Sequence, residues 1–212
     1  MDVSPKTVLI HYHGGFLIVG DRYSYPPYWL LHACASREWT FVTPDYRLIP
    51  ETTAHAALDD AVHAYEWVHS VLPGLLGCQV SSVLLASSSA GGYLALSTAS
   101  VVAKKPEALL LIYGMLDPAD YLTGISGLSQ SIASRGIQAI PVECSLRAQK
   151  KLRAAGSDVL VEFPEDAEHG FDARIGNVNV EGLNGDGIPT VESLRRVICF
   201  LDSSIANGPK IS

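Results

Sequence analysis

Residues 83–92 read Val-Leu-Leu-Ala-Ser-Ser-Ser-Ala-Gly-Gly, an apolar run that passes through small residues into a helical stretch. This pattern predicts a sharp strand-to-helix turn that lifts Ser89 above the helix N-terminus, whose N–H groups favour developing negative charge. The turn needs small residues two positions before and after the serine, here Ser87 and Gly91. Ser87 replaces the first glycine of the usual G-x-S-x-G pattern. A Ser/Gly-rich turn that only caps a helix would look the same.

A second signal is the His-Gly-Gly sequence that follows the apolar run at 7–12. Glycine lets a ligand approach the backbone closely, so the N–H groups of Gly14 and Gly15 can hold a negatively charged oxygen. Together with the N–H group of Ala90, they predict an oxyanion hole beside Ser89. The two signals together favour nucleophilic catalysis over a structural turn.

Apolar runs alternate with longer stretches of helical spacing along the chain. We expect strands at 7–12, 39–43, 82–86, 108–113 and 158–163. We expect helices at 28–35, 56–71, 90–103, 142–155 and 191–205. The alternation predicts a single α/β domain over residues 1–212, with a mostly parallel sheet covered by helices on both faces. In such sheets the working residues gather beyond the carboxyl ends of the strands.

The composition argues against several classes of function. The 212 residues carry a formal net charge of -7 without a sizeable Lys/Arg cluster, so we expect no nucleic-acid partner. The four cysteines are far apart, and His11 and His13 lack a third convergent ligand, so we expect no metal site. The sequence shows neither a signal peptide nor a membrane-spanning run, which predicts a soluble, cytoplasmic protein.

Four short motifs give the chain a family resemblance. Residues 13–16 (HGGF), 44–51 (PDYRLIPE), 88–92 (SSAGG) and 168–171 (EHGF) occur in this order. They resemble the HGGG, D-Y-R-L-x-P-E, G-D-S-A-G-G and H-G-F motifs of the α/β-hydrolase fold. The similar branch contains hormone-sensitive lipase and bacterial and fungal carboxylesterases. The resemblance implies a serine hydrolase that needs no cofactor.

His169 is the expected general base. It follows the apolar run at 158–163, where a loop at the tip of the sheet can bring its imidazole to Ser89. It would accept the proton of the serine hydroxyl and later give that proton to the leaving group.

The acid that should support this histidine is harder to find. In this fold the acid stands between the serine and the histidine in the chain, after a strand. Only 136–140 offers such a strand, and the usual aspartate after it is absent. Glu143 and Asp117 are the two candidate substitutes. Glu143 could instead be an ordinary glutamate in the first turn of a helix, where it interacts with the helix dipole. Asp117 could instead be an aspartate that forms a turn before Pro118.

The sequence therefore predicts a shortened member of the family. The two strands expected before Thr7 and most of the lid over the substrate are missing from the pattern. Open sheet edges favour association, so we expect homodimers or aggregation.

The expected activity is hydrolysis of small carboxylic esters through an acyl-enzyme on Ser89. Aromatic residues after the oxyanion loop, Phe16, Tyr23 and Tyr25, favour small, fairly apolar acyl or alcohol groups. Two alternatives stay open. One is a non-catalytic binding or scaffold protein, because the acid strand is missing. The other is a lactonase, acyltransferase or dehydratase on the same fold.

Overall fold

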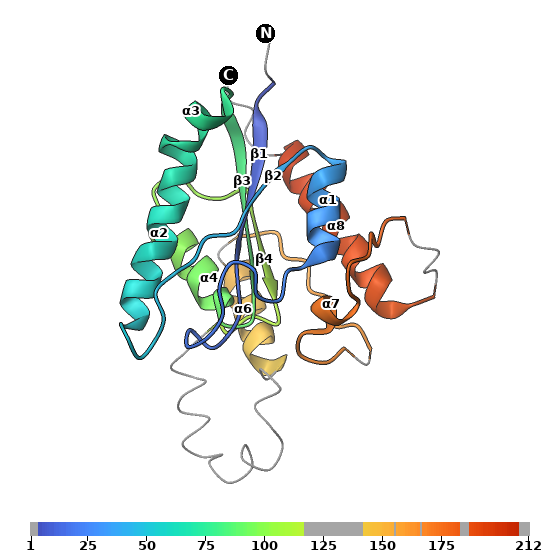
Figure 1. Cartoon of the computed structure of the whole chain (residues 1–212). Coiled ribbons are helices and arrows are strands. Elements are labelled where there is room, and N and C mark those ends of the chain that lie inside the picture. The colour runs from blue at the N-terminus through green and yellow to red at the C-terminus, as the bar shows by residue number, and fades with distance from the viewer. Residues whose placement is uncertain (1–3, 117–141, 155, 166, 183–186, 208–212) are drawn as a thin grey trace.

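A parallel sheet forms the centre of the molecule (Figure 1). The computed structural model describes residues 4–116, 142–154, 156–165, 167–182 and 187–207. Within these residues the sheet has four strands in the order β2-β1-β3-β4. The strands are β1 (Lys6–Tyr12), β2 (Thr40–Val42), β3 (Val80–Ser88) and β4 (Ala108–Ile112). All pairs are parallel, so the strands end at the same edge of the sheet.

Helices cover both faces of this sheet, as the sequence predicts (Figure 1). One face carries α2 and α4, and the other carries α1 and α8. The helix bounds are α1 (Tyr28–Ser36), α2 (Ala54–Ser70), α3 (Leu72–Leu76), α4 (Gly91–Val101), α6 (Val142–Ala154), α7 (Phe171–Arg174) and α8 (Pro189–Asn207). The predicted mostly parallel sheet with helices on both faces is confirmed.

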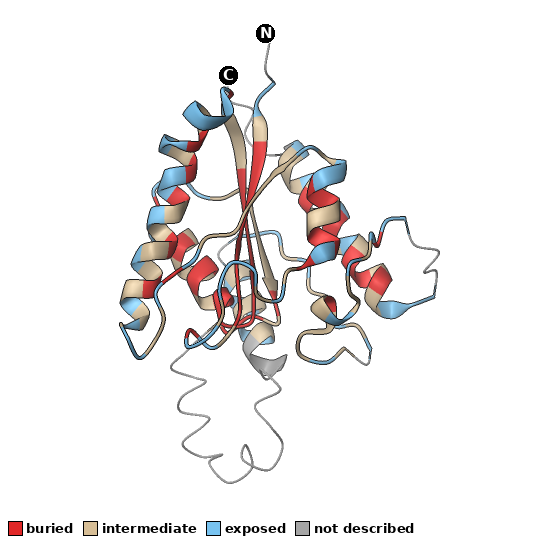
Figure 2. Ribbon diagram, viewed as in Figure 1, coloured by how far each residue is buried: buried red, intermediate tan, exposed pale blue. Residues whose placement is uncertain are grey.

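Strand β1 shows why the sheet is buried on both sides (Figure 2). Successive side chains of a strand point to opposite faces. Val8 and Ile10 accordingly pack in the cluster that contains α2 and α4, while Leu9 packs with Trp29 of α1 and with α8. All four of these side chains are fully buried. Such two-sided burial explains the nearly continuous apolar sequence of the strand.

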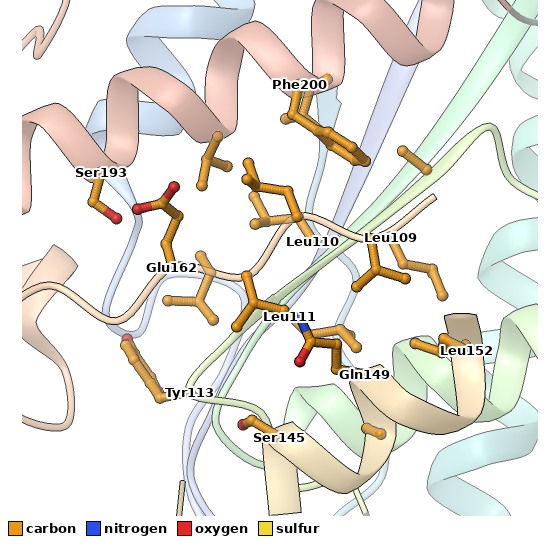
Figure 3. A pocket seen from close by; sticks show the side chains of 18 of the residues that line it. Leu109, Leu110, Leu111, Tyr113, Ser145, Gln149, Leu152, Glu162, Ser193 and Phe200 are labelled. Carbon is orange, nitrogen blue, oxygen red and sulfur yellow. The ribbon is translucent and has the colours of Figure 1, made fainter. Parts of the chain in front are cut away.

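The predicted fifth strand at 158–163 is wrong. The structure places this segment without strand pairing, although its sequence is apolar. A cavity of about 1240 Å³ separates it from β4, and α6 and α8 close the sides (Figure 3). Leu109, Leu110 and Leu111 all line this cavity, so it opens on the edge of β4 where a further strand would pair. Apolar composition predicted the strand, but a strand also needs a neighbour with which to share hydrogen bonds.

Some predictions concern residues whose structure is not described. The weak strand at 136–140 and the candidate acid Asp117 both fall between residues 117 and 141, outside the described ranges. The expected dimerisation through an open sheet edge stays a prediction.

Candidate functional site

Ser89 lies at the turn between β3 and α4, beyond the carboxyl end of the strand. Its φ is 50°, a left-handed conformation that a non-glycine residue adopts only under constraint. Backbone hydrogen bonds hold it there, one of them from the Gly92 N–H group to the Ser89 carbonyl at 2.9 Å. The Ser89 N–H group donates to the Ile112 carbonyl at 3.0 Å, and the Met115 N–H group donates to the Ser89 carbonyl at 2.7 Å. A strained strand-to-helix turn of this kind exposes the serine hydroxyl at the tip of the sheet.

The glycine two positions after the serine is required by close packing. A Cβ atom on Gly91 would lie 2.2 Å from the carbonyl oxygen of Tyr12 and 2.7 Å from that of His13. Only a residue without a side chain lets α4 begin this close to β1. The small residue that the elbow pattern demands thus has a steric reason in the structure.

The neighbouring serine has a different role. The Ser88 side chain points into the protein, where its Oγ lies 3.1 Å from Nε2 of His11. Burial lowers the pKa of His11 to about 3, so this imidazole is neutral near pH 7. Ser88 therefore belongs to the buried polar interior, and Ser89 is the serine that faces His169 at the strand tips.

The loop after β1 lies against Ser89. A Cβ atom on Gly14 would be 3.1 Å from Cβ of Ser89, and Gly15 has a φ of 116° that favours glycine. Tyr46, from the PDYRLIPE motif, fixes the loop by donating its hydroxyl to the His13 carbonyl at 2.8 Å and stacking on the His13 ring. In the described part of the chain, the N–H groups of Gly14, Gly15 and Ala90 have no acceptor. Unpaired backbone N–H groups close to the serine are what an oxyanion hole requires.

His169 meets Ser89 across the site, with Nε2 3.0 Å from the serine Oγ. The loop that carries it is held by Arg174, which donates to the His169 carbonyl at 2.8 Å and pairs with the Glu168 carboxylate. The Tyr113 ring lies against the imidazole, with ring centroids 4.5 Å apart. The sequence prediction placed Ser89 and His169 at one site, and the structure brings them within hydrogen-bond distance.

The surroundings of His169 disfavour its charged form. Burial lowers the pKa of His169 below its ordinary value of 6.5, because the charged imidazolium loses solvation. The Asp172 carboxylate opposes this shift, and the Arg174 guanidinium adds to it. A neutral imidazole with Nε2 facing a hydroxyl is able to accept a proton from it.

Both predicted acids fall outside the described part of the site. Asp117 is outside the described ranges, and Glu143 stands at the second position of α6, where only the backbone is described. Asp172, which the sequence pattern did not single out, is 1% exposed. The feature that could have drawn attention to Asp172 is its position, three residues after His169 at the start of a short helix. It was overlooked because the family order places the acid before the histidine.

The described residues offer no group of three His, Cys, Asp or Glu side chains arranged to hold a metal ion. In the same part of the chain, none of the helices has the length and apolar character needed to span a membrane.

Comparison with known proteins gives matches over about half of the chain. A family model described as alpha/beta hydrolase fold matches residues 9–136. Esterase LipU of Mycobacterium tuberculosis is 36% identical over 121 residues, covering 56% of this chain and 38% of that protein. Lipase 2 of Moraxella sp. is 36% identical over 109 residues, covering 50% and 24%. Hormone-sensitive lipase of Homo sapiens is 31% identical over 125 residues, covering 54% and 11%. The matched segments span less than half the length of each relative.

Solved structures match over a longer part of the chain. Francisella virulence factor BioJ has a TM-score of 0.68 and 19% identity, over 95% of this chain and 78% of that one. DphMB1 has a TM-score of 0.69 and 22% identity, over 96% of this chain and 79% of that one. At these identities the two structures support the fold alone.

Proposed function

Because the chain belongs to the alpha/beta hydrolase fold family, we propose that it hydrolyses small carboxylic esters through an acyl-enzyme on Ser89. The observation that carries this proposal is the 3.0 Å contact between Ser89 Oγ and His169 Nε2 at a strained strand-to-helix turn. Esterase and lipase relatives at 31–36% identity support the same reaction class.

In the proposed reaction Ser89 Oγ attacks the ester carbonyl carbon, and its proton passes to Nε2 of His169. The N–H groups of Gly14, Gly15 and Ala90 bind the oxygen that becomes negatively charged. The bond to the alkoxy oxygen then breaks, and His169 returns the proton to the departing alcohol. A water molecule, deprotonated by His169, attacks the acyl-enzyme and releases the carboxylic acid and free Ser89.

The preference for small esters rests on the segment after the oxyanion loop. Phe16 is 37% exposed, and Tyr23 and Tyr25 are more exposed still. These aromatic side chains offer apolar contact to a short acyl or alcohol group near the strand tips.

The test is turnover of p-nitrophenyl acetate, butyrate and octanoate by the purified protein. We expect acetate and butyrate to be hydrolysed with a higher kcat/KM than octanoate. The matched control is His169→Gln, which keeps the size of the side chain but lacks the proton acceptor. Folded wild type that turns over none of the three esters above the rate of His169→Gln would contradict the proposal.

The pH dependence follows from the lowered pKa of His169. Only the neutral imidazole accepts the serine proton, so kcat/KM should rise with pH and level off once His169 is deprotonated. Because burial lowers this pKa, we expect the midpoint below the ordinary value of 6.5. A kcat/KM profile for p-nitrophenyl butyrate gives the midpoint directly. A midpoint above that ordinary value would show that the site stabilises the charged imidazole instead.

A non-catalytic binding function is the second candidate. The observation in its favour is that Nδ1 of His169 has no hydrogen-bond acceptor within the described ranges. In a serine hydrolase an acidic side chain normally occupies that position, and its loss costs about 10⁴ in rate. A folded protein that binds esters without hydrolysing them would favour this candidate.

A further inference from the structure

A buried carboxylate shares the neighbour Tyr113 with His169 and is not used by the proposed reaction. Asp172, in the first turn of α7, is 1% exposed. Both of its oxygens accept hydrogen bonds, Oδ2 from Trp29 Nε1 at 3.2 Å and Oδ1 from the Tyr113 hydroxyl at 2.5 Å. An ionised carboxylate is an acceptor only, so two facing donors fit that form.

The hydrogen-bond donors to Asp172 connect this carboxylate to the part of the molecule that contains His169. Trp29 comes from α1, and Tyr113 follows directly after β4. The ring of Tyr113 lies against the His169 imidazole, with centroids 4.5 Å apart, while its hydroxyl holds Asp172. One aromatic side chain therefore contacts both groups and fixes the position of the carboxylate relative to the imidazole.

Among the described residues, the charged groups that act on the pKa of His169 are Asp172 and Arg174. Asp172 favours the charged imidazole and Arg174 disfavours it, and both come from the short helix that follows the histidine. The Glu168 carboxylate is paired with Arg174 and is exposed, so solvent screens it more than buried Asp172. From the strand side His169 faces the neutral groups Ser89 and Tyr113.

We propose that Asp172 is a positioning carboxylate of this site, stabilising the protonated form of His169 through space while Trp29 and Tyr113 hold it in place. The inference rests on the proposed function, because the imidazole becomes charged only when it takes the serine proton. Asp172 contacts neither Ser89 nor the oxyanion groups and would act through His169 alone.

The charge can be removed with little change in shape. In Asp172→Asn the amide oxygen can accept from Trp29, and the Tyr113 hydroxyl can turn to accept from the amide nitrogen. We expect the variant to lower the pKa of His169 by about one unit, because an opposite charge nearby favours the charged form. We expect kcat to fall about tenfold with little change in KM, since the substrate does not touch Asp172.

Two measurements separate this effect from a structural one. The pH profile of kcat/KM gives the pKa of His169 through activity, and an NMR titration of the His169 ring gives it without any substrate. The His169→Gln variant assigns the signal among the seven histidines. If the wild type lacks esterase activity, the proposed function fails, but the NMR titration still tests the action of Asp172.

The matched control is Tyr113→Phe, which removes a hydrogen bond to the carboxylate but keeps its charge and the aromatic ring. The proposal expects the pKa of His169 to hold or rise in this variant and to fall in Asp172→Asn. Equal pKa values in wild type and Asp172→Asn would overturn it. If Asp172→Asn does not fold, the test rests on Tyr113→Phe. A fall in the pKa of His169 in Tyr113→Phe would then overturn the proposal.

Discussion

Replacing Ser89 with alanine is expected to reduce the kcat for p-nitrophenyl butyrate by about 10⁴-fold or more. The substitution removes the hydroxyl oxygen that forms the acyl bond, while the oxyanion N–H groups stay in place. The effect should be in kcat, since the binding surface around the substrate is unchanged. Initial rates with wild type and Ser89→Ala, prepared and purified in the same way, give the comparison.

The matched control is the adjacent serine. Ser88→Ala removes a hydroxyl that points to the buried His11 and not to His169. We expect Ser88→Ala to lower the melting temperature but to retain more than about a tenth of the activity. If Ser88→Ala were as inactive as Ser89→Ala while folded, the assignment of the nucleophile to Ser89 would be wrong.

Gly91→Ala is expected to destabilise the protein strongly, because the added methyl group meets backbone atoms of β1 and the loop after it. The new Cβ would lie 2.2 Å from the Tyr12 carbonyl oxygen and 2.7 Å from that of His13, and both are backbone atoms that cannot rotate away. The start of α4 must therefore move away from β1. We expect the free energy of unfolding to fall by about 3 kcal/mol or more, which exceeds the gain that alanine normally brings to a helix. Thermal unfolding followed by circular dichroism measures this loss.

A second glycine provides the control for this substitution. Gly74, in α3, has no atom within 4 Å of the position that a Cβ atom would take. Gly74→Ala adds the same methyl group in open space and should leave the melting temperature unchanged or raise it slightly. If Gly91→Ala melted at the temperature of the wild type, the close approach of α4 to β1 would not be required.

The elements that could be predicted from the sequence are those with a strong local pattern. The continuous apolar runs at β1, β3 and β4 and the helical spacing of α2 require burial on specific faces, so the pattern shows them directly. The strand at 158–163 has the same composition, but a strand depends on a partner at the right distance. Composition carries no information about that partner, so the prediction was wrong there.

Some residues of the candidate site could also be predicted from the sequence, and others could not. The elbow around Ser89 and the loop at Gly14 are predictable because steric crowding forces small residues at fixed spacing. His169 was found from its position after an apolar run in a recognisable motif. Asp172 could not be found in this way, because its burial and its contacts come from Trp29 and Tyr113, which are distant in the sequence. The place of the Asp172 carboxylate beside the site depends on contacts that exist only in the folded core.

The most direct test of the central claim is labelling with a fluorophosphonate, followed by intact-mass measurement and peptide mapping. This reagent reacts preferentially with a serine that is activated by a base, and it needs no knowledge of the natural ester. We predict one adduct per chain, located on Ser89, with labelling greatly slowed in His169→Gln. A folded wild-type protein that stays unlabelled, or that carries its adduct on another serine, would contradict the account.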